Sequence, residues 1–82
     1  MDIVLSKDAN KQYNHLPKPE QAKIHKKLIA LRQDLYAGKK LTGDLAGIRS
    51  LRAWPYRILY EINEKAQRIE VHKIAHRQGV YR

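Results

Sequence analysis

The chain has 82 residues, enough for one small domain, and it carries no cysteine, which excludes disulfides and thiolate metal sites. Its longest apolar run, Leu28-Ile29-Ala30-Leu31, is far shorter than the ~20 residues that span a bilayer, so we expect no membrane segment. A chain without cysteine is compatible with a reducing cytosol, and its four histidines lack a metal-binding spacing, so we expect a cytoplasmic protein without metal or cofactor. Seventeen Lys and Arg against eight Asp and Glu give a net charge of +9, which predicts a polyanionic partner such as RNA.

The first part of the chain is predicted to form a strand and a short helix. Ile3-Val4-Leu5 is typical of a β-strand, and Ser6 directly after it is typical of a helix N-cap. Apolar residues at positions 9, 13 and 16 repeat with helical spacing and predict one apolar helix face. Pro17-Lys18-Pro19 ends this helix, because the residue before a proline avoids the helical conformation.

A second helix is predicted from Pro19, which suits the first helical position, to Gly38, which suits the position after a last turn. Its apolar residues have the 3.6-residue period of an amphipathic helix: Ile24, Leu28, Leu31 and Leu35. Because the linker is so short, the two helices are expected to form an antiparallel hairpin.

From Lys39 onward the apolar period becomes two, which predicts β-strands around residues 51–53, 56–62 and 69–74. The apolar phase of the last strand slips near His72-Lys73, which predicts a β-bulge or a strand end there. The expected fold is one α+β domain over residues 1–82 with the order βααβββ. In it, the helical hairpin packs on one face of a mainly antiparallel four-stranded sheet.

The positive charge is concentrated in the second half of the chain. Residues 38–82 hold ten basic and four acidic side chains (net +6), whereas residues 1–37 hold seven and four (net +3). Only Arg32 of the arginines lies in the first half, and the planar fork of arginine suits bidentate phosphate contacts. We expect the polyanion to bind the second half. A basic surface that serves only solubility is the alternative, and it fits the first half better.

Two motifs of the second half resemble the RelE/ParE superfamily of type II toxins. They are Leu51-Arg52 followed by Tyr56-Arg57-Ile58-Leu59-Tyr60-Glu61-Ile62, and Ile74-Ala75-His76-Arg77 followed by Val80-Tyr81. The similarity covers essentially the whole chain. It implies a compact βααβββ toxin that a cognate antitoxin neutralises. RelE-like members cleave messenger RNA, usually in the ribosomal A site, whereas ParE-like members share the fold but act on DNA gyrase.

RNA cleavage without a metal uses the substrate 2′-hydroxyl as nucleophile and needs cations on the phosphate and groups that move protons. Arg57 on the central strand and Arg77 just past the last strand could meet over one face if those strands are neighbours. The resemblance implies that Arg57 binds the phosphate, that Arg77 contacts the scissile phosphate and leaving group, and that Tyr81 stacks on a base. His76 is a candidate general acid or base.

Further cations of the second half are candidates for binding RNA: Lys39, Lys40, Arg49, Arg52 and Lys73. Two positions depart from the superfamily pattern. Ser50 stands where one of two closely spaced cations is expected, and Trp54-Pro55 replaces the usual Gly-Asp-like hairpin turn. The first departure leaves weak cleavage open, and the second predicts a turn of different geometry that could serve specificity.

Each candidate also has a purely structural interpretation. Arg57 could pair with Glu61, His76 could be a solvated turn residue, and Tyr81 could be a core or sheet-edge contact. Trp54 is interpreted as a packing residue at the hairpin rather than as a platform for base stacking.

Three functions follow from these observations. The first is a ribosome-associated endoribonuclease toxin that leaves a 2′,3′-cyclic phosphate and is neutralised by a cognate antitoxin. The second is a toxin that binds a protein target such as gyrase, and the third is a plain RNA-binding module. The His76-Arg77 motif with Val80-Tyr81 favours the first.

Overall fold

The computed structural model describes residues 1–80, and its elements follow the predicted order with one additional short strand. In chain order they are β1 (Asp2–Leu5), α1 (Lys7–Asn14), α2 (Lys18–Gln33), β2 (Lys39–Lys40), a 3-10 turn (Gly43–Leu45), β3 (Arg49–Ala53), β4 (Tyr56–Asn63) and β5 (Arg68–His76). Within residues 1–80, no helix is long and apolar enough to cross a membrane. Tyr81, for which base stacking is predicted, lies outside the described residues.

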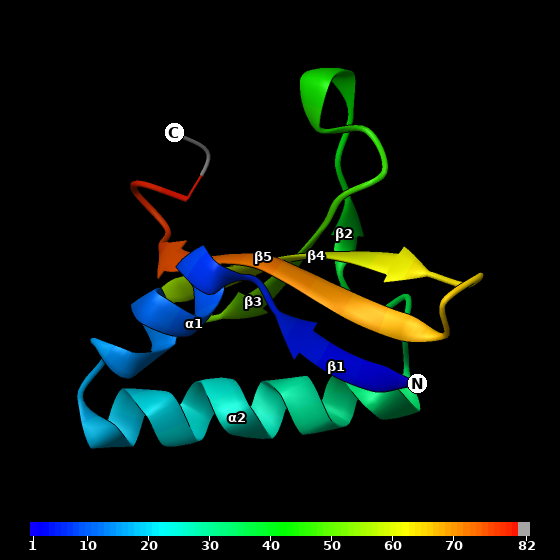
Figure 1. Cartoon of the computed structure of the whole chain (residues 1–82). Helices are drawn as coiled ribbons and strands as arrows, with labels where there is room; N and C mark the ends of the chain where they lie inside the picture. The colour runs from blue at the N-terminus through cyan, green and yellow to red at the C-terminus, as the bar shows by residue number, and fades with distance from the viewer. Residues whose placement is uncertain (81–82) are drawn as a thin grey trace.

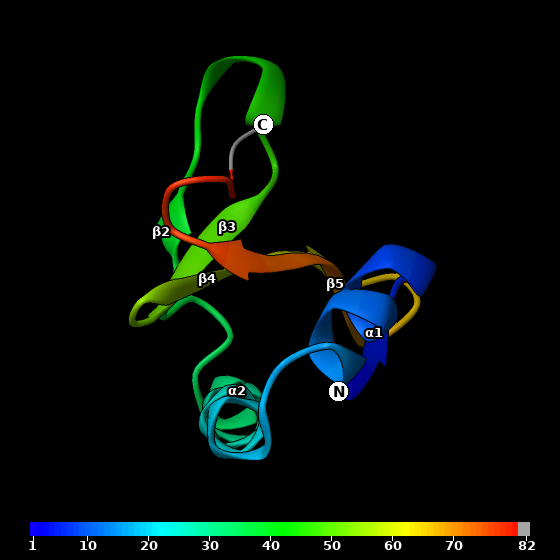
Figure 2. The same cartoon turned by 90° about the vertical axis from the view of Figure 1, so that its left-hand side faces the viewer.

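The strands form one five-stranded sheet in the order β1-β5-β4-β3-β2, in which only β1 and β5 run parallel. The α2 helix runs along one side of this sheet and α1 lies beside β5, so the two helices leave the opposite face open (Figures 1 and 2). The prediction of an α+β fold is confirmed, but the expected count of four strands is one too low. The extra strand, β2, has only two residues, too few for any apolar period to reveal it.

The hydrophobic core fills the space between the helices and the sheet. From the sheet it takes alternate residues of β4 and β5, because successive side chains of a strand point to opposite faces. Three of the four residues of the predicted helix stripe are buried in it: Ile24, Leu28 and Leu31. The fourth, Leu35, lies beyond the helix and packs on the core from the following turn.

The end of α2 differs from the prediction: the helix ends at Gln33, five residues before Gly38. Gly38 has another role, because its amide donates a hydrogen bond to the Tyr60 hydroxyl (3.0 Å), which in turn donates to the Leu35 carbonyl (2.8 Å). A Cβ at residue 38 would lie 2.7 Å from Cε1 of Tyr60. The glycine is therefore explained by the close approach of the buried Tyr60 ring and not by a helix cap.

The predicted bulge in the last strand is confirmed. Leu59 pairs with Lys73 and the next residue of β4, Tyr60, pairs with Val71, so His72 is the extra residue of β5. The bulge returns the apolar residues on both sides of it to the core face, since Val71 and Ile74 are both buried there.

The start of α1 is tied to this bulge. The Ser6 hydroxyl oxygen accepts a hydrogen bond from the Ala9 amide (3.0 Å), as predicted for an N-cap. The same hydroxyl donates to the His72 carbonyl (3.1 Å). One side chain therefore satisfies the end of a helix and fixes α1 against β5.

Candidate functional site

Two arginines face each other directly on the open face of the sheet. Arg57 in β4 pairs with Arg52 in β3 and alternates with Ile58, whose side chain is buried in the core, so both arginines point away from the helices. The Arg57 side chain forms neither a hydrogen bond nor an ion pair with any of residues 1–80. Its alternative partner, Glu61, is hydrogen-bonded to His72 instead. The guanidinium of Arg57 is thus available to a ligand.

The turn between β3 and β4 brings a third arginine to this place. The Arg77 guanidinium lies 4.7 Å from the centre of the Trp54 ring, and the Arg52 guanidinium lies 5.8 Å from the same ring. The Arg77 amide donates a hydrogen bond to the Pro55 carbonyl (2.9 Å), which holds the chain after β5 against the turn. We call Arg52, Arg57 and Arg77, with the Trp54 ring, the arginine cluster.

Trp54 packs at the hairpin only in part. The residue is 54% exposed, and its ring contacts the Arg52 and Arg77 guanidiniums rather than the core. In the sequence, a tryptophan next to a proline in a two-residue turn is as compatible with a packed hairpin end as with an exposed ring. Arg52 comes to the ring from the last turn-side residues of β3, and Arg77 through its hydrogen bond to Pro55; the sequence pattern did not reveal the second contact.

Two predicted lysines lie on the same open face. Lys39 pairs with Ser50, which pairs with Leu59, which pairs with Lys73, so all four share one row across the sheet. Lys73 also donates a hydrogen bond to the Gly79 carbonyl (3.3 Å) and so holds the segment after β5 above this face. That segment rises on the side of the sheet away from α2 (red in Figure 1).

Two other predicted cations are not brought to the arginine cluster. Arg49 pairs with Tyr60, whose ring is in the core, so it lies in the other phase of β3 from Arg52. Its guanidinium donates to the Gly38 carbonyl (2.8 Å) and lies 4.9 Å from the centre of the Tyr36 ring. Lys40 pairs with Arg49 and shares its phase. The contacts of Arg49 therefore support the chain after α2.

His76 ends β5 on the helix side of the sheet. It pairs with Tyr56, and the two rings meet edge to face with centres 5.9 Å apart. Its Nδ1 accepts a hydrogen bond from the Gln78 amide (3.3 Å). Arg57 pairs with Ala75, one residue earlier, so His76 and Arg57 belong to opposite phases of the sheet.

Ser50, which stands in place of an expected cation, is buried with 1% of its surface exposed. Leu59 and Val80 are also buried, yet neither belongs to the core between the helices and the sheet. The open face therefore has a small apolar region of its own below the segment after β5. An unpaired cation at position 50 would be costly to bury there, which explains why a small neutral side chain fits.

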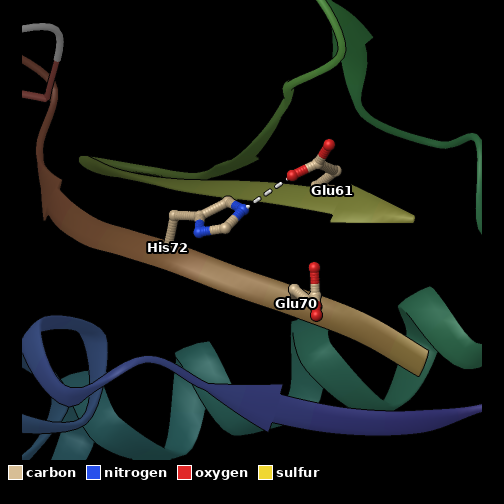
Figure 3. Close-up of side chains that lie close together, drawn as sticks. All are labelled: Glu61, Glu70 and His72. Carbon is tan, nitrogen blue, oxygen red and sulfur yellow. Dashed lines mark hydrogen bonds and ion pairs between the residues drawn. The ribbon is translucent and has the colours of Figure 1, made fainter. Parts of the chain in front are cut away.

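The other end of the open face is acidic (Figure 3). Glu61 and Glu70 pair directly across β4 and β5. His72 Nε2 lies 3.1 Å from Glu61 Oε1, and Arg68 Nε lies 2.9 Å from Glu70 Oε2. The hydrogen bond from Arg68 holds the pKa of Glu70 below its ordinary value of 4.5. We call Glu61, Glu70 and His72 the acidic cluster.

Within residues 1–80, the acidic cluster is the one set of three potential metal ligands whose donor atoms lie within 4.8 Å of one another. Sequence analysis missed it because the set depends on the cross-strand register and on the bulge at His72, not on a spacing motif. Two carboxylates and an imidazole suit a divalent cation. All three residues are at least partly exposed, however, and both carboxylates already have protein partners, so we assign no metal to them.

A cavity of about 430 Å³ lies on the helix side of the molecule, between β1 and α2. No predicted site residue lines it. Its wall consists of Asp2, Ile3, Leu5, His25, Leu28, Ile29 and Arg32. The arginine cluster and this cavity are therefore separate features.

The fold, two helices packed on a mostly antiparallel sheet with arginines on the uncovered face, is assigned to a family by comparison with known proteins. A family model described as the ParE toxin of the type II toxin-antitoxin system parDE matches residues 3–81. The chain belongs to this family and with it to the RelE/ParE superfamily, which confirms the resemblance seen in the sequence motifs.

Two curated relatives from Mycobacterium tuberculosis match part of the chain. Toxin RelE is 42% identical over 45 residues, which cover 55% of this chain and 46% of the relative. Toxin RelG is 37% identical over 51 residues, which cover 62% of this chain and 59% of the relative. The chain thus spans about half the length of the curated relatives it matches.

Solved structures share the fold over nearly the whole chain. The toxin-antitoxin complex RelBE2 from Mycobacterium tuberculosis matches with a TM-score of 0.82 and 27% identity, covering 92% of this chain and 95% of the other. A YoeB/ParE toxin from Agrobacterium tumefaciens matches with a TM-score of 0.82 and 24% identity, covering 93% and 98%. The second likeness shows the fold alone.

Proposed function

We propose that this chain is the toxin of a type II toxin-antitoxin system and that it cleaves messenger RNA, in the ribosomal A site, without a metal ion. The observation that carries the proposal is the arginine cluster. Arg52 and Arg57 face each other with no carboxylate between them, and Arg77 is held beside them by the turn. Three converging cations on an open face suit the charge that builds on a phosphate during cleavage.

The reaction we propose forms one bond and breaks another at the same phosphorus. The 2′-oxygen of the RNA attacks the adjacent phosphate and loses its proton, while the bond to the 5′-oxygen breaks and that oxygen gains a proton. The products are a 2′,3′-cyclic phosphate and a 5′-hydroxyl. Arg57 and Arg77 stabilise the negative charge on the phosphate oxygens, and Arg77 also contacts the leaving oxygen.

We assign one of the two proton transfers to His76, a candidate general acid or base. We assign base stacking to Tyr81, as the superfamily resemblance implies for that residue. His76 lies at the end of β5 directly before Arg77, but its ring lies beside Tyr56 on the helix side. A role in proton transfer therefore requires the RNA to pass around the end of β5. His76→Gln should then slow the chemical step by about 10²- to 10⁴-fold, measured in single-turnover cleavage of ribosome-bound message at saturating toxin.

The proposal is tested by inducing the protein in cells and mapping the 5′ ends of RNA while DNA supercoiling is measured. Cuts in phase with codons are expected, together with unchanged supercoiling. A supercoiling defect without cuts would contradict the proposal and support the second candidate, a ParE-like toxin that binds DNA gyrase. The match to the ParE family model favours that candidate. If neither cuts nor a supercoiling defect is observed, a plain RNA-binding module remains as the function.

We also propose a cognate antitoxin that covers the basic open face with acidic or amphipathic segments. Two observations support it: the net charge of +6 in residues 38–82 and the likeness in fold to the toxin of the RelBE2 complex. Electrostatic steering should make association fast and sensitive to salt. The complex should melt above the free chain, because a partner that binds only the folded state stabilises it. An antitoxin that contacts residues 7–36 alone would contradict masking of the arginine cluster.

A further inference from the structure

Trp54 is a large aromatic side chain exposed at the edge of a cationic surface. Burying such a ring is favourable, so a ring that is 54% exposed in the folded chain has apolar surface left for a ligand to cover. The ligand must also accept the positive charge around it, since Arg52 and Arg77 both lie against the ring. Nucleic acid combines both properties, because its bases have flat apolar faces and its phosphates are anionic.

We propose that Trp54 binds an unpaired nucleobase of the RNA substrate by stacking, while Arg52 and Arg77 contact the phosphates of the same strand. The inference deepens the proposed function and rests on RNA as its substrate. Aromatic side chains interleaved with cations are the common means of holding single-stranded RNA. In this role Trp54 is a substrate-binding residue, because it orders one nucleotide next to the phosphate at Arg57 and Arg77 without reading the base sequence.

The backbone of the turn is fixed on both sides, so the ring is held ready for the base. The Trp54 carbonyl accepts a hydrogen bond from Lys23 Nζ in α2 (3.1 Å), and the Pro55 carbonyl accepts one from the Arg77 amide (2.9 Å). A ring that is already ordered loses little further freedom when a base stacks on it. The turn that departs from the superfamily pattern thus supplies a base contact in addition to the one assigned to Tyr81.

A second exposed aromatic residue provides a matched control. Tyr36 is 55% exposed, and an arginine, Arg49, lies 4.9 Å from its ring centre. Its hydroxyl, however, donates a hydrogen bond to Glu64 (3.0 Å), and it belongs to the turn after α2 rather than to the arginine cluster. If exposure and an arginine neighbour alone were enough to bind a base, Tyr36 would bind one too.

The fluorescence of Trp54 reports the contact directly, because it is the chain's one tryptophan. The probe is an unstructured RNA hexamer of alternating adenosine and cytidine with 2′-O-methyl groups, which cannot be cleaved, and its control is an abasic hexamer with the same backbone. The hexamer should quench the emission in a saturable way, and the abasic control should bind with little quenching. Equal quenching by both, saturation without quenching, or no binding at low salt would overturn the inference.

Variants measure the size of the effect by fluorescence anisotropy of the labelled hexamer. Trp54→Leu should weaken binding by about 5- to 150-fold, the range for loss of one stacked base, whereas Trp54→Phe should recover much of it. Tyr36→Leu should bind like the parent, and all three variants should bind the abasic hexamer like the parent. Parental affinity of Trp54→Leu for the base-containing hexamer would overturn the inference, provided that its melting curve shows a folded chain.

These measurements can fail independently of the proposed nuclease. If the uncleavable hexamer stacks on Trp54 but ribosome-bound message is not cleaved, the proposed nuclease activity is contradicted. Trp54 is then a base-binding residue of an RNA-binding protein. If the parent cleaves message and Trp54→Leu has the same kcat and KM as the parent, the nuclease activity is retained and the base contact of Trp54 is contradicted. An increase in KM alone is the expected result if stacking contributes to binding but not to the chemical step.

Discussion

Residues of like charge face each other at both ends of the open sheet face, but the repulsion is compensated within the protein at only one of them. Residues of like charge directly opposite each other on neighbouring strands destabilise a sheet. At the acidic end, Glu61 faces Glu70, and each carboxylate has a partner within the protein, His72 or Arg68. At the basic end, Arg52 faces Arg57, and neither guanidinium forms an ion pair within residues 1–80.

The comparison separates a structural cluster from a site. The two pairs lie about 13 Å apart along β4, at about 3.3 Å per residue, on the same face of the same sheet. Where the repulsion is relieved by neighbours, the folded chain needs nothing further. Where it is not relieved, stability is lost in the free protein and regained when an anion binds. The basic end thus has the properties of a site for phosphate.

The largest expected effect is on cleavage. Arg57→Ala and Arg77→Ala should each slow cleavage by about 10²-fold, which corresponds to about 3 kcal/mol of transition-state stabilisation, because each removes one preorganised donor from the phosphate. Folding should be retained, since neither side chain is part of the core. The measurement is cleavage of ribosome-bound message at matched concentrations of folded protein. Arg68→Ala, at the acidic end, is the matched control and should cleave like the parent. Parental cleavage by both Arg57→Ala and Arg77→Ala would place the chemistry elsewhere.

A smaller effect should appear in stability, with the opposite sign. Arg52→Glu replaces a repulsive pair with an attractive one and should stabilise the free protein by about 0.5 to 1 kcal/mol at low salt, while it weakens RNA binding. For a chain of this size that corresponds to an increase in Tm of about 2 to 8 °C. Arg52→Gln should lie between the parent and Arg52→Glu, because it removes the repulsion without adding an attraction. A Tm below that of the parent for both variants would show that the two arginines do not repel each other in the folded chain.

Local signals in the sequence were sufficient where one residue decides the structure. Ser6 forms the predicted N-cap, and the slip of the apolar phase marks the bulge at His72. The N-cap depends on a local backbone preference of serine, and the bulge is visible in the period of the apolar residues around it. The end of α2 depended instead on a distant contact. Gly38 has the character of a helix stop, yet it is fixed by the ring of Tyr60, 22 residues further along.

The charged residues of the candidate site could be predicted from the sequence, but the side of the sheet on which each side chain lies was not predicted. The sequence predicted that Arg57 and Arg77 lie near each other; the structure places Arg57 in β4, two residues after the β3–β4 turn, and Arg77 against the turn itself. His76 shares the phase of Ile74, two residues earlier, and so lies on the core side of the sheet; the alternation along the strand carried this signal, and the prediction of a general acid or base did not use it. The exposure of Trp54, in contrast, depends on how the turn is placed against the sheet and the chain after β5.

The smallest expected effect tests the acidic end through its dependence on pH. Arg68 lowers the pKa of Glu70 from its ordinary 4.5 by its hydrogen bond, and a further hydrogen bond from Asn63 acts in the same direction. Burial acts in the opposite direction and is outweighed by these hydrogen bonds. The folded state therefore binds this proton less readily than the unfolded chain does.

The contribution of the Arg68–Glu70 ion pair to stability is consequently present above about pH 4.5, and it is lost as the pH falls through the lowered pKa of Glu70. Urea midpoints measured between about pH 3 and 6 should fall toward acid in the parent, and this part of the fall should be smaller in Arg68→Gln, where the attraction to Glu70 is gone. Both carboxylates still face each other in that variant, so protonating Glu70 would then relieve repulsion rather than break an ion pair. An identical acid profile for the parent and Arg68→Gln would mean that Arg68 does not compensate the acidic pair. The two ends of the open face would then differ in sign of charge alone, and the absence of counter-ions at the arginines would no longer distinguish a site.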